Sequence, residues 1–422
     1  MKISILTTAI KSFFKFDANN FEKSDVVFFS ADVDRPVVIK DGKQFSPIID
    51  SIFMEFESIG VKCSSYALPW SRLSKSRTFF DVKTINKKFL WAKILKKVFK
   101  YLGADKLSLE ISKNPYRSVL KESKPRLVLG IGLPPDLCES CKELSIDCYE
   151  VLHSMGYSRH TWGWNNRSET QLPTGVVCFD KTSFKTFKKF GRGLKIFHTM
   201  HPYFSKIGNI NNFSKTYPGV FKSVTSIEVS ANTKKMKKVC VFLQWGYSGE
   251  LDRLSGILDN GLFPDCLIDI IEATRETIDW HFRFHPVQIV EPKYKRQFDY
   301  IDSLSKNNAN VFWKYATNEP LPFLLSQVDL CIGMSTHAVY DAASFGKKSA
   351  LLCPTVLPGG YFENCADDLV NEGLVAKFSP SFDSIFNWIQ TTKTTLDRKH
   401  SNGKKSQISS VFLKNVLFPD KN

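Results

Sequence analysis

Short apolar runs alternate with amphipathic stretches along the first half of the chain. A short run rich in Val, Leu, Phe and Cys, bounded by polar residues, is typical of a buried strand. Where apolar residues recur every three or four positions, the pattern predicts a helix instead. The first half therefore predicts strands over 25–30, 61–64, 126–130, 147–152, 175–180 and 194–198, with helices over 49–59 and 135–144.

A second series of the same kind follows the polar and basic stretch 229–238. It predicts strands over 239–243, 279–284, 311–313, 328–332 and 349–353, with helices over 266–277, 322–327 and 335–345. Strands alternating with helices favour a parallel sheet with helical crossovers. We therefore predict an α/β protein with two doubly wound, Rossmann-like domains, 1–232 and 233–422, facing a central cleft. We expect the C-terminal tail to pack back on the first domain.

The composition agrees with two globular domains. The chain has 422 residues, of which 43% are hydrophobic and 24% charged, and this length suits two cores. The ten Cys lie mostly in apolar runs, which is typical of a reduced, cytoplasmic protein. No stretch is apolar for long enough to span a bilayer. The apolar start, 1–10, runs into Lys11 and Lys15 without a small-residue cleavage site, which predicts a strand and not a signal peptide.

The net charge of +16 is concentrated in one stretch. Residues 81–126 hold thirteen Lys or Arg against four Asp or Glu. On a helical projection one face carries Trp91, Ala92, Leu95, Val98, Phe99 and Leu102, and the opposite face carries Lys93, Lys96, Lys97 and Lys100. Two interpretations stay open: a helix that lies on an anionic membrane surface, and a helix that buries its apolar side in a core. The sequence has no nucleic-acid-binding motif, and we expect no nucleic acid partner.

The clearest candidate for chemistry is the segment Arg283-Phe-His285-Pro286. Alternation along a strand sends Arg283 and His285 to the same face, and Pro286 ends the strand. A cation and an imidazole at the carboxyl end of a strand suit the phosphates of a nucleotide, and the imidazole can also meet the departing oxygen. The alternative is a solvated edge strand.

A second candidate follows the predicted strand 328–332. Ser335 or Thr336 is expected to cap the next helix, whose exposed N–H groups favour an anion, and their hydroxyls add donors. Asp341 lies one to two turns further along, where its carboxylate can reach a ribose or sugar hydroxyl. The alternative is a capped helix with no ligand.

Together these segments resemble a known group of enzymes. Bacterial surface-polysaccharide glycosyltransferases of the GT-B fold, which build capsule and lipopolysaccharide, carry Arg-x-His-Pro and, about 50 residues later, a Ser-Ser or Ser-Thr helix start followed by an acidic residue. Sialyltransferases, transferases for 3-deoxy-manno-octulosonic acid and CDP-polyol transferases share the pattern. The stretch 241–247, with Gln244 and Gly246, is similar to the strand and loop that open their second domain. The resemblance covers roughly 239–375 and makes 233–422 the domain that binds the nucleotide-sugar.

The resemblance also reaches two residues of the first domain, which it makes the acceptor side. Glu150-Val-Leu-His153 is similar to a Glu-x-x-His-Gly segment of the same enzymes, although Ser154 stands where they have Gly. The resemblance implies His153 as a candidate base or phosphate contact, with Glu150 second. The paired Cys138 and Cys141, near Cys148, do not reach zinc-site spacing, and we expect neither a metal nor another cofactor.

The resemblance implies an inverting, metal-independent glycosyltransferase. It would move a sugar, with a CMP-linked acidic sugar as one candidate, from a nucleotide-activated donor to a growing or lipid-linked bacterial surface glycan. Its expected location is the cytoplasm, peripheral to the inner face of the cytoplasmic membrane. Three alternatives stay open: a CDP-polyol phosphotransferase of the teichoic-acid type, a catalytically inactive glycan-assembly subunit, and a sugar epimerase on the same fold.

Overall fold

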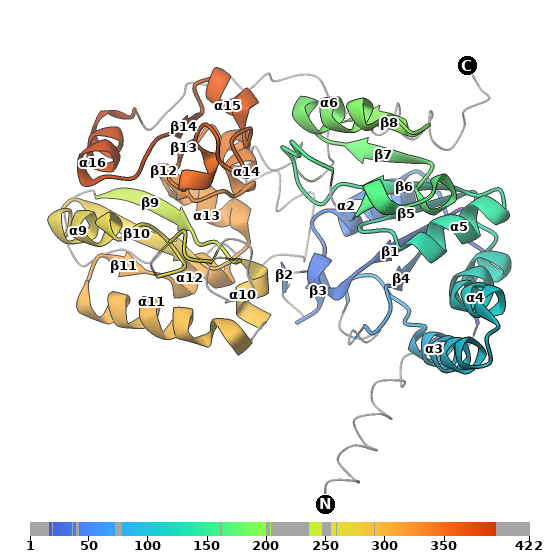
Figure 1. Cartoon of the computed structure of the whole chain (residues 1–422). Helices are drawn as coiled ribbons and strands as arrows, with labels where there is room; N and C mark the ends of the chain where they lie inside the picture. Colours follow the sequence, from blue (N-terminus) through green and yellow to red (C-terminus); the bar gives the residue numbers. More distant parts are fainter. Residues whose placement is uncertain are drawn as a thin grey trace, which may run out of the picture. The chain divides into compact units, whose positions relative to one another are not determined.

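The computed structural model divides the described chain into two compact units, each built on its own sheet (Figure 1). The N-terminal unit and the C-terminal unit are treated separately below. The structure describes residues 17–18, 20–35, 37–38, 42–71, 78–160, 163–199, 203, 236–246, 255–258, 260–290 and 292–393. The expected strand over 1–10, the boundary between 232 and 233 and the C-terminal tail lie outside these residues.

The N-terminal unit contains a six-stranded parallel sheet. Its strands are β1 (Val26–Ser30), β4 (Cys63–Ala67), β5 (Leu127–Gly130), β6 (Asp147–Val151), β7 (Gly175–Cys178) and β8 (Lys195–His198). Their order is β4-β1-β5-β6-β7-β8, so the direction of strand addition reverses between β1 and β5. A short antiparallel pair, β2 (Val37–Val38) and β3 (Gln44–Phe45), stands apart from this sheet. The sheet is doubly wound, as the alternating pattern predicts.

Helices cover both faces of this sheet. They are η1 (Asp32–Asp34), α2 (Ile49–Ser58), α3 (Asn86–Tyr101), α4 (Asp105–Ser123), α5 (Pro135–Glu143), η3 (Trp164–Asn166), η4 (Glu169–Gln171) and α6 (Lys181–Phe190). Val26 and Phe28 of β1 pack with α2, while the alternate residues Val27 and Phe29 pack with Tyr116 of α4. This period of two places a separate hydrophobic core on each face.

The C-terminal unit contains a second six-stranded parallel sheet. Its strands are β9 (Lys237–Phe242), β10 (Ile278–Arg283), β11 (Val311–Phe312), β12 (Leu330–Gly333), β13 (Lys348–Leu351) and β14 (Val375–Lys377). The order β11-β10-β9-β12-β13-β14 is that of the doubly wound Rossmann sheet. The chain adds β10 and β11 on one side of β9 and then returns to add β12 on the other.

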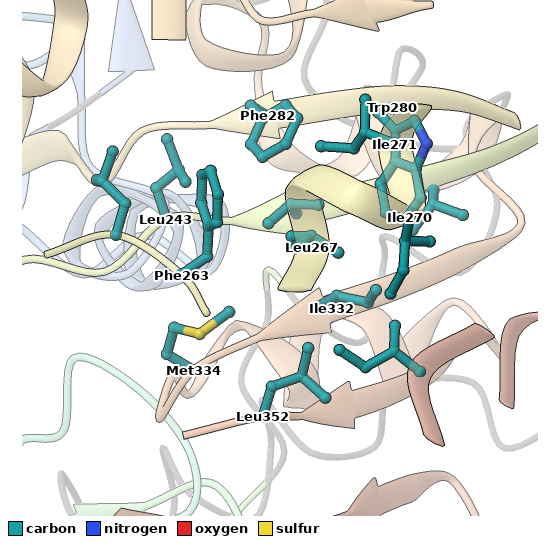
Figure 2. Close-up of a cluster of buried hydrophobic side chains, with 14 of the residues drawn as sticks. Leu243, Phe263, Leu267, Ile270, Ile271, Trp280, Phe282, Ile332, Met334 and Leu352 are labelled. Atoms are coloured by element: carbon teal, nitrogen blue, oxygen red, sulfur yellow. The ribbon is translucent and has the colours of Figure 1, made fainter. Parts of the chain in front are cut away.

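Helices again cover both faces. They are α9 (Cys266–Ala273), α10 (Pro286–Val290), η5 (Pro292–Tyr294), α11 (Lys295–Asn307), α12 (Lys314–Asn318), α13 (Leu321–Gln327), α14 (Ala338–Ser344), η6 (Pro354–Val356), α15 (Asp367–Asn371) and α16 (Phe382–Thr391). On one face Leu267, Ile270 and Ile271 of α9 pack against Trp280 and Phe282 of β10 (Figure 2). Leu324 and Leu325 of α13 pack against Cys240 and Phe242 on the other face.

The predicted strands within the described residues are present, but several helices were not predicted. The longest of these are α4, α6, α11 and α16, whose polar exposed faces weaken the apolar signal. The predicted helix 335–345 is shorter and begins at Ala338. No helix in the described part of the chain has both the length and the apolar character needed to cross a membrane.

The predicted apolar face of α3 is divided in the structure. Phe89 and Ala92 are buried and Phe99 is half-buried, whereas Trp91, Leu95, Val98 and Leu102 are exposed. Lys96 is half-buried on the same side as Phe99, while Lys93, Lys97 and Lys100 are exposed. The prediction that these apolar residues form one face was therefore wrong. The helix packs on the unit through Phe89, Ala92 and Phe99, and the rest of the predicted face is exposed.

Candidate functional site

Three strand ends meet at the reversal point of the C-terminal sheet. Arg283 is in register with Phe242 on the central strand β9, and Phe242 is in register with Gly333 on β12. Because parallel strands end at the same edge, the segments that follow these three residues emerge together. Ligands of open α/β sheets bind at such an edge, where the strand order reverses. The two predicted motifs and the Gln244–Gly246 loop are therefore neighbours, although they are far apart in sequence.

Arg283 ends β10 and is half-buried. Its Nη1 donates to the carbonyl oxygen of Glu319 at 2.7 Å and also to that of Ala316. These bonds tie the guanidinium to the end of α12 and the turn after it. Arg283 therefore has a structural role in addition to its predicted contact with phosphate.

His285 follows two residues later and is half-buried. Its Nδ1 accepts a hydrogen bond from the backbone N–H of Val287 at 3.2 Å. A neutral imidazole whose Nδ1 accepts carries its proton on Nε2, so Nε2–H is the donor that His285 can offer to a phosphate oxygen. Pro286 is the first residue of α10, as expected for a proline that ends a strand.

A buried glutamine, which the sequence did not predict, joins two of these segments. Gln288 Oε1 accepts the backbone N–H of His285 at 2.8 Å, and its Nε2 donates to the carbonyl of Gln244 at 3.3 Å. Nε2 also donates to Gln297 Oε1 at 2.6 Å, and Gln297 Nε2 donates to the carbonyl of Gly261 at 3.2 Å. Gln288 is 1% exposed. This chain of amides fixes the loop after β9 against the loop after β10.

An indole ring stands beside His285. Trp245 is 41% exposed, and its ring centroid is 5.7 Å from that of His285 with the planes tilted by 40°. The next residue, Gly246, has φ +89°, a conformation that L side chains rarely adopt. The predicted residue Gly246 therefore turns the chain, whereas Gln244 contributes its backbone carbonyl and Trp245 an accessible aromatic surface.

Ser335 and Thr336 lie in the turn between β12 and α14. Ser335 is buried, and Thr336 Oγ1 accepts the N–H of Ala338 at 3.1 Å, so its own proton remains able to donate. Position 333 requires glycine, because an added Cβ would lie 2.5 Å from Thr336 Cγ2. The predicted side-chain bond to the helix start is made by Thr336, which stands one residue before the N-cap position; His337, at the N-cap, makes no side-chain capping bond.

Asp341 lies on α14, electrostatically coupled to Arg283. Part of its surface is exposed, but the surrounding protein desolvates the carboxyl group and raises its pKa from 3.8 to about 7, and the positive charge of Arg283 opposes that rise. The carboxyl group therefore changes its charge near neutral pH. This is suitable for a hydrogen bond with a hydroxyl, in which Asp341 either donates or accepts.

The two predicted residues of the N-terminal unit lie at and beyond the end of β6. Glu150 is fully buried, and its Oε1 and Oε2 accept the N–H groups of Gly132 and Leu133 at 2.5 and 2.8 Å. Burial raises its pKa from 4.5 to about 8, and the two amide bonds lower it in part. Since both oxygens are occupied away from solvent, Glu150 positions the turn after β5. This geometry favours a positioning role for Glu150 over its predicted role as a second base.

His153 is exposed and belongs to a loop that is held by hydrogen bonds to buried or half-buried residues. Its Nδ1 lies 2.7 Å from the hydroxyl of the buried Tyr157, and desolvation lowers the pKa of the imidazole. Asp180, which caps α6, accepts the N–H groups of Gly156 and Ser183 at 2.9 and 2.8 Å. The imidazole of His153 therefore hydrogen-bonds the Tyr157 hydroxyl, while the residue itself is exposed.

An acidic residue at the end of β1 was not predicted. Asp34 is half-buried and accepts the N–H of Ala31 at 2.8 Å, and burial raises its pKa from 3.8 to about 6. The neighbouring Arg35 is buried and donates to Ser30 Oγ at 2.6 Å, with Asp50 at 3.5 Å. The sequence shows only a common Asp-Arg pair here, because the burial that distinguishes it is a property of the folded chain.

The paired cysteines of α5 lie in a hydrophobic core of the N-terminal unit. Cys138, Cys141 and Cys148 are fully buried, and the first two hydrogen-bond to Cys148 between α5 and β6. Across the described ranges, no group of three or more His, Cys, Asp or Glu is arranged to hold a metal ion.

The fold resembles those of solved enzymes. UDP-GlcNAc 2-epimerase from Methanocaldococcus jannaschii, in complex with UDP-GlcNAc and UDP, superposes with a TM-score of 0.53 and 14% identity over 92% of this chain and 98% of that one. The same enzyme from Neisseria meningitidis, bound to UDP-GlcNAc, gives 0.51 and 14% over 87% and 91%. No protein-family model and no curated sequence matches the chain. At these identities the likeness shows the fold, which is GT-B as predicted.

Proposed function

We propose that the chain is an inverting, metal-independent glycosyltransferase that uses a nucleotide-activated sugar. The observation that carries this proposal is the register of Arg283, Phe242 and Gly333, which gathers both motifs at the reversal point of the C-terminal sheet. The donor's phosphates would lie there, near Arg283, the Nε2–H of His285, and the hydroxyls of Ser335 and Thr336. Such positive and hydrogen-bonding groups stabilise the charge that develops on a departing phosphate.

The proposed reaction is a single displacement. A hydroxyl oxygen of the acceptor attacks the anomeric carbon while the bond from that carbon to the donor phosphate breaks. His153, on the N-terminal unit, is our candidate to accept the hydroxyl proton, because its imidazole is exposed and its lowered pKa leaves it unprotonated near neutral pH. The leaving nucleotide keeps the electron pair, and no metal enters the proposal.

We further propose that the acceptor is a growing or lipid-linked bacterial surface glycan of the capsule or lipopolysaccharide kind. The support is the resemblance of the Arg283–Pro286 and Ser335–Asp341 segments to enzymes of that class. Such an enzyme would work in the cytoplasm, at the inner face of the membrane, and contact of Lys93, Lys96, Lys97 and Lys100 with anionic lipid is one of the two interpretations left open for that helix. A CMP-linked acidic sugar is the first donor to test.

A donor screen tests the proposal directly. Thermal unfolding of the full chain is followed with CMP-, CDP-, UDP- and GDP-linked donors, since a ligand at 100 times its dissociation constant stabilises by about 2.7 kcal/mol. We expect one nucleotide class to raise the melting temperature of the wild type, and His285→Ala to reduce that rise. If no nucleotide-sugar stabilises the chain, or His285→Ala responds like the wild type, the donor site is wrongly placed.

The same screen separates the alternatives. A CDP-polyol transferase would respond to CDP-glycerol or CDP-ribitol, and an inactive assembly subunit would bind a donor without any turnover. An epimerase is also tested, because the similar structures include UDP-GlcNAc 2-epimerases. Conversion of UDP-GlcNAc to its 2-epimer, without an acceptor, would replace our proposal with that activity.

A further inference from the structure

The outermost helix of the N-terminal unit is attached along one narrow side. In α3, only Asn86, Phe89 and Ala92 are buried. Phe89 meets Tyr116 of α4 with ring centroids 5.0 Å apart, and Ser108 Oγ donates to the carbonyl of Lys96 at 3.2 Å. Figure 1 shows α3 beside α4 at the margin of this unit. Most of the helix surface therefore faces away from the core.

That outer surface is apolar. Trp91 is 63% exposed and Tyr101 92% exposed, although aromatic side chains are usually largely buried. We define the α3 stripe as the exposed residues Trp91, Ile94, Leu95, Val98, Tyr101 and Leu102. Leu107 and Leu109 of α4 extend the exposed apolar surface beyond it, so residues 91–109 hold eight of the fourteen exposed large hydrophobic side chains in the described chain. A concentration of this kind marks an interaction surface and not scattered surface residues.

The stripe is bordered by positive charge. Helix α3 contains six Lys and no acidic residue, and Lys87, Lys93, Lys97 and Lys100 are exposed. Lys93 Nζ lies 4.8 Å from the centre of the ring of Trp70, a further exposed aromatic residue that follows β4. Two copies of this surface facing one another would bring like charges together, which disfavours a homodimer. A partner that is both apolar and anionic matches both features.

We propose that α3 docks this protein onto an anionic bilayer surface. The helix would lie in the plane of the membrane with Trp91, Leu95, Val98 and Leu102 inserted among the acyl chains. Lys93, Lys97 and Lys100 would meet the phosphate and other anionic groups of the lipids. This arrangement is that of an interfacial amphipathic helix, whose binding combines buried apolar area with attraction to anionic lipid. The inference concerns where the protein works, and it stands whichever reaction the C-terminal unit performs.

The proposal differs from attachment by lysines alone, and salt distinguishes the two. Each Lys near an anionic surface contributes roughly fivefold to partitioning, and salt screens that contribution. Insertion of the α3 stripe is not screened. We therefore expect high salt to weaken binding without abolishing it, whereas binding by charge alone would disappear.

Co-sedimentation of the full chain with vesicles tests the proposal. We expect binding to vesicles of phosphatidylcholine with phosphatidylglycerol, and weaker but measurable binding to phosphatidylcholine alone, because apolar insertion remains there without the attraction of charge. The triple variant Trp91→Ser, Leu95→Ser, Val98→Ser should lose at least tenfold in partitioning, and so should Lys93→Glu, Lys97→Glu, Lys100→Glu. Trp91 fluorescence should shift to shorter wavelength on anionic vesicles, and a smaller fraction of the protein should show this shift on neutral ones.

Matched controls come from elsewhere in the same unit. Lys185→Glu, Lys188→Glu, Lys189→Glu makes the same charge change on exposed residues of α6, and Ile59→Ser removes an exposed apolar side chain beyond α2. Both should bind anionic vesicles like the wild type, and every variant should keep the wild-type melting temperature. Equal recovery on neutral and anionic vesicles, or an equal loss in the α6 control, would overturn the proposal. So would a dimer in solution that the serine variant abolishes, without vesicle binding.

Discussion

The carboxyl ends of the two parallel sheets use their polar residues differently. In the C-terminal unit, Gln288 hydrogen-bonds the backbone of His285 and of Gln244, and His285 and Trp245 keep accessible surface. In the N-terminal unit, the carboxylate oxygens of Glu150 and Asp180 accept backbone N–H groups, whereas His153 is exposed. Among the described residues, the first edge has several preorganised groups for a ligand, while the second presents His153 on a stabilised loop. An edge of the first kind suits a charged donor that needs many contacts.

The largest expected effect is a loss of stability when Glu150, at the carboxyl edge of the N-terminal sheet, is replaced. Glu150→Ala leaves the N–H groups of Gly132 and Leu133 buried without their acceptor, and we expect a loss of about 4 kcal/mol in the free energy of unfolding. His153→Ala, at an exposed site, should lose less than about 1 kcal/mol. Chemical unfolding of both variants measures the difference. Equal stabilities would mean that Glu150 is not the structural member of the pair.

The stability of the fold should decrease at both high and low pH, through two different buried groups. The folded-state pKa of Glu150, about 8, is raised above its ordinary 4.5, so its contribution to stability is lost as pH rises through about 8. His281, fully buried with no hydrogen bond to either ring nitrogen, has a pKa lowered from 6.5 to about 3, so stability falls as pH drops below 6.5. The free energy of unfolding should fall by about 2 kcal/mol through Glu150 as pH rises from 6 to 8. It should fall by about 2 kcal/mol through His281 as pH drops from 7 to 5.

Single variants test whether Glu150 and His281 cause the two slopes of the free energy of unfolding against pH. Glu150→Gln should flatten the alkaline side of a plot of unfolding free energy against pH, and His281→Leu should flatten the acid side. His281→Leu should also be neutral or stabilising at pH 7, because it removes unpaired buried nitrogens. A plot whose slopes survive both substitutions would show that other groups control the pH dependence.

At the C-terminal edge, two variants separate binding from folding. His285→Ala and Arg283→Ala should each weaken donor binding tenfold or more, about 1.4 kcal/mol, through loss of a contact to phosphate. Only Arg283→Ala should also destabilise the fold, by about 1 to 3 kcal/mol, since the carbonyls of Ala316 and Glu319 lose their donor. Calorimetric titration beside chemical unfolding distinguishes them. Unchanged stability in Arg283→Ala would contradict the role given to these bonds.

The smallest expected effect concerns positioning. Gln288→Ala releases the Gln244 carbonyl and the His285 N–H, and we expect roughly a three- to tenfold loss of donor affinity without loss of any direct contact. Gln327→Ala is the matched control, because that glutamine bonds Tyr315 and Phe323 on α12 and α13 instead. If the two variants bind donor equally well, the amide chain does not position the site.

The sequence by itself determined the strands of the two sheets other than β14, the doubly wound pattern and the segments that meet at the C-terminal edge. These follow from local information: the apolar strand residues 239–243 and 328–332 carry their burial in their own composition, and Arg283, His285 and Pro286 are contiguous. Parallel strands of one sheet end at one edge, so predicting the strands also predicted that the residues after them would be neighbours.

Only the tertiary structure decided what each polar or apolar side chain does. Glu150 accepts the N–H groups of Gly132 and Leu133 and so positions that turn. Gln288 joins two loops because it hydrogen-bonds the backbone of both His285 and Gln244. The predicted apolar face of α3 was divided because α4 packs along Phe89 and Ala92 and leaves Trp91 outside. A helical projection gives the angles between the side chains of one helix. It does not show which side of the helix packs against another segment of the chain. Which side packs depends on contacts between residues remote in sequence, and no local pattern records them.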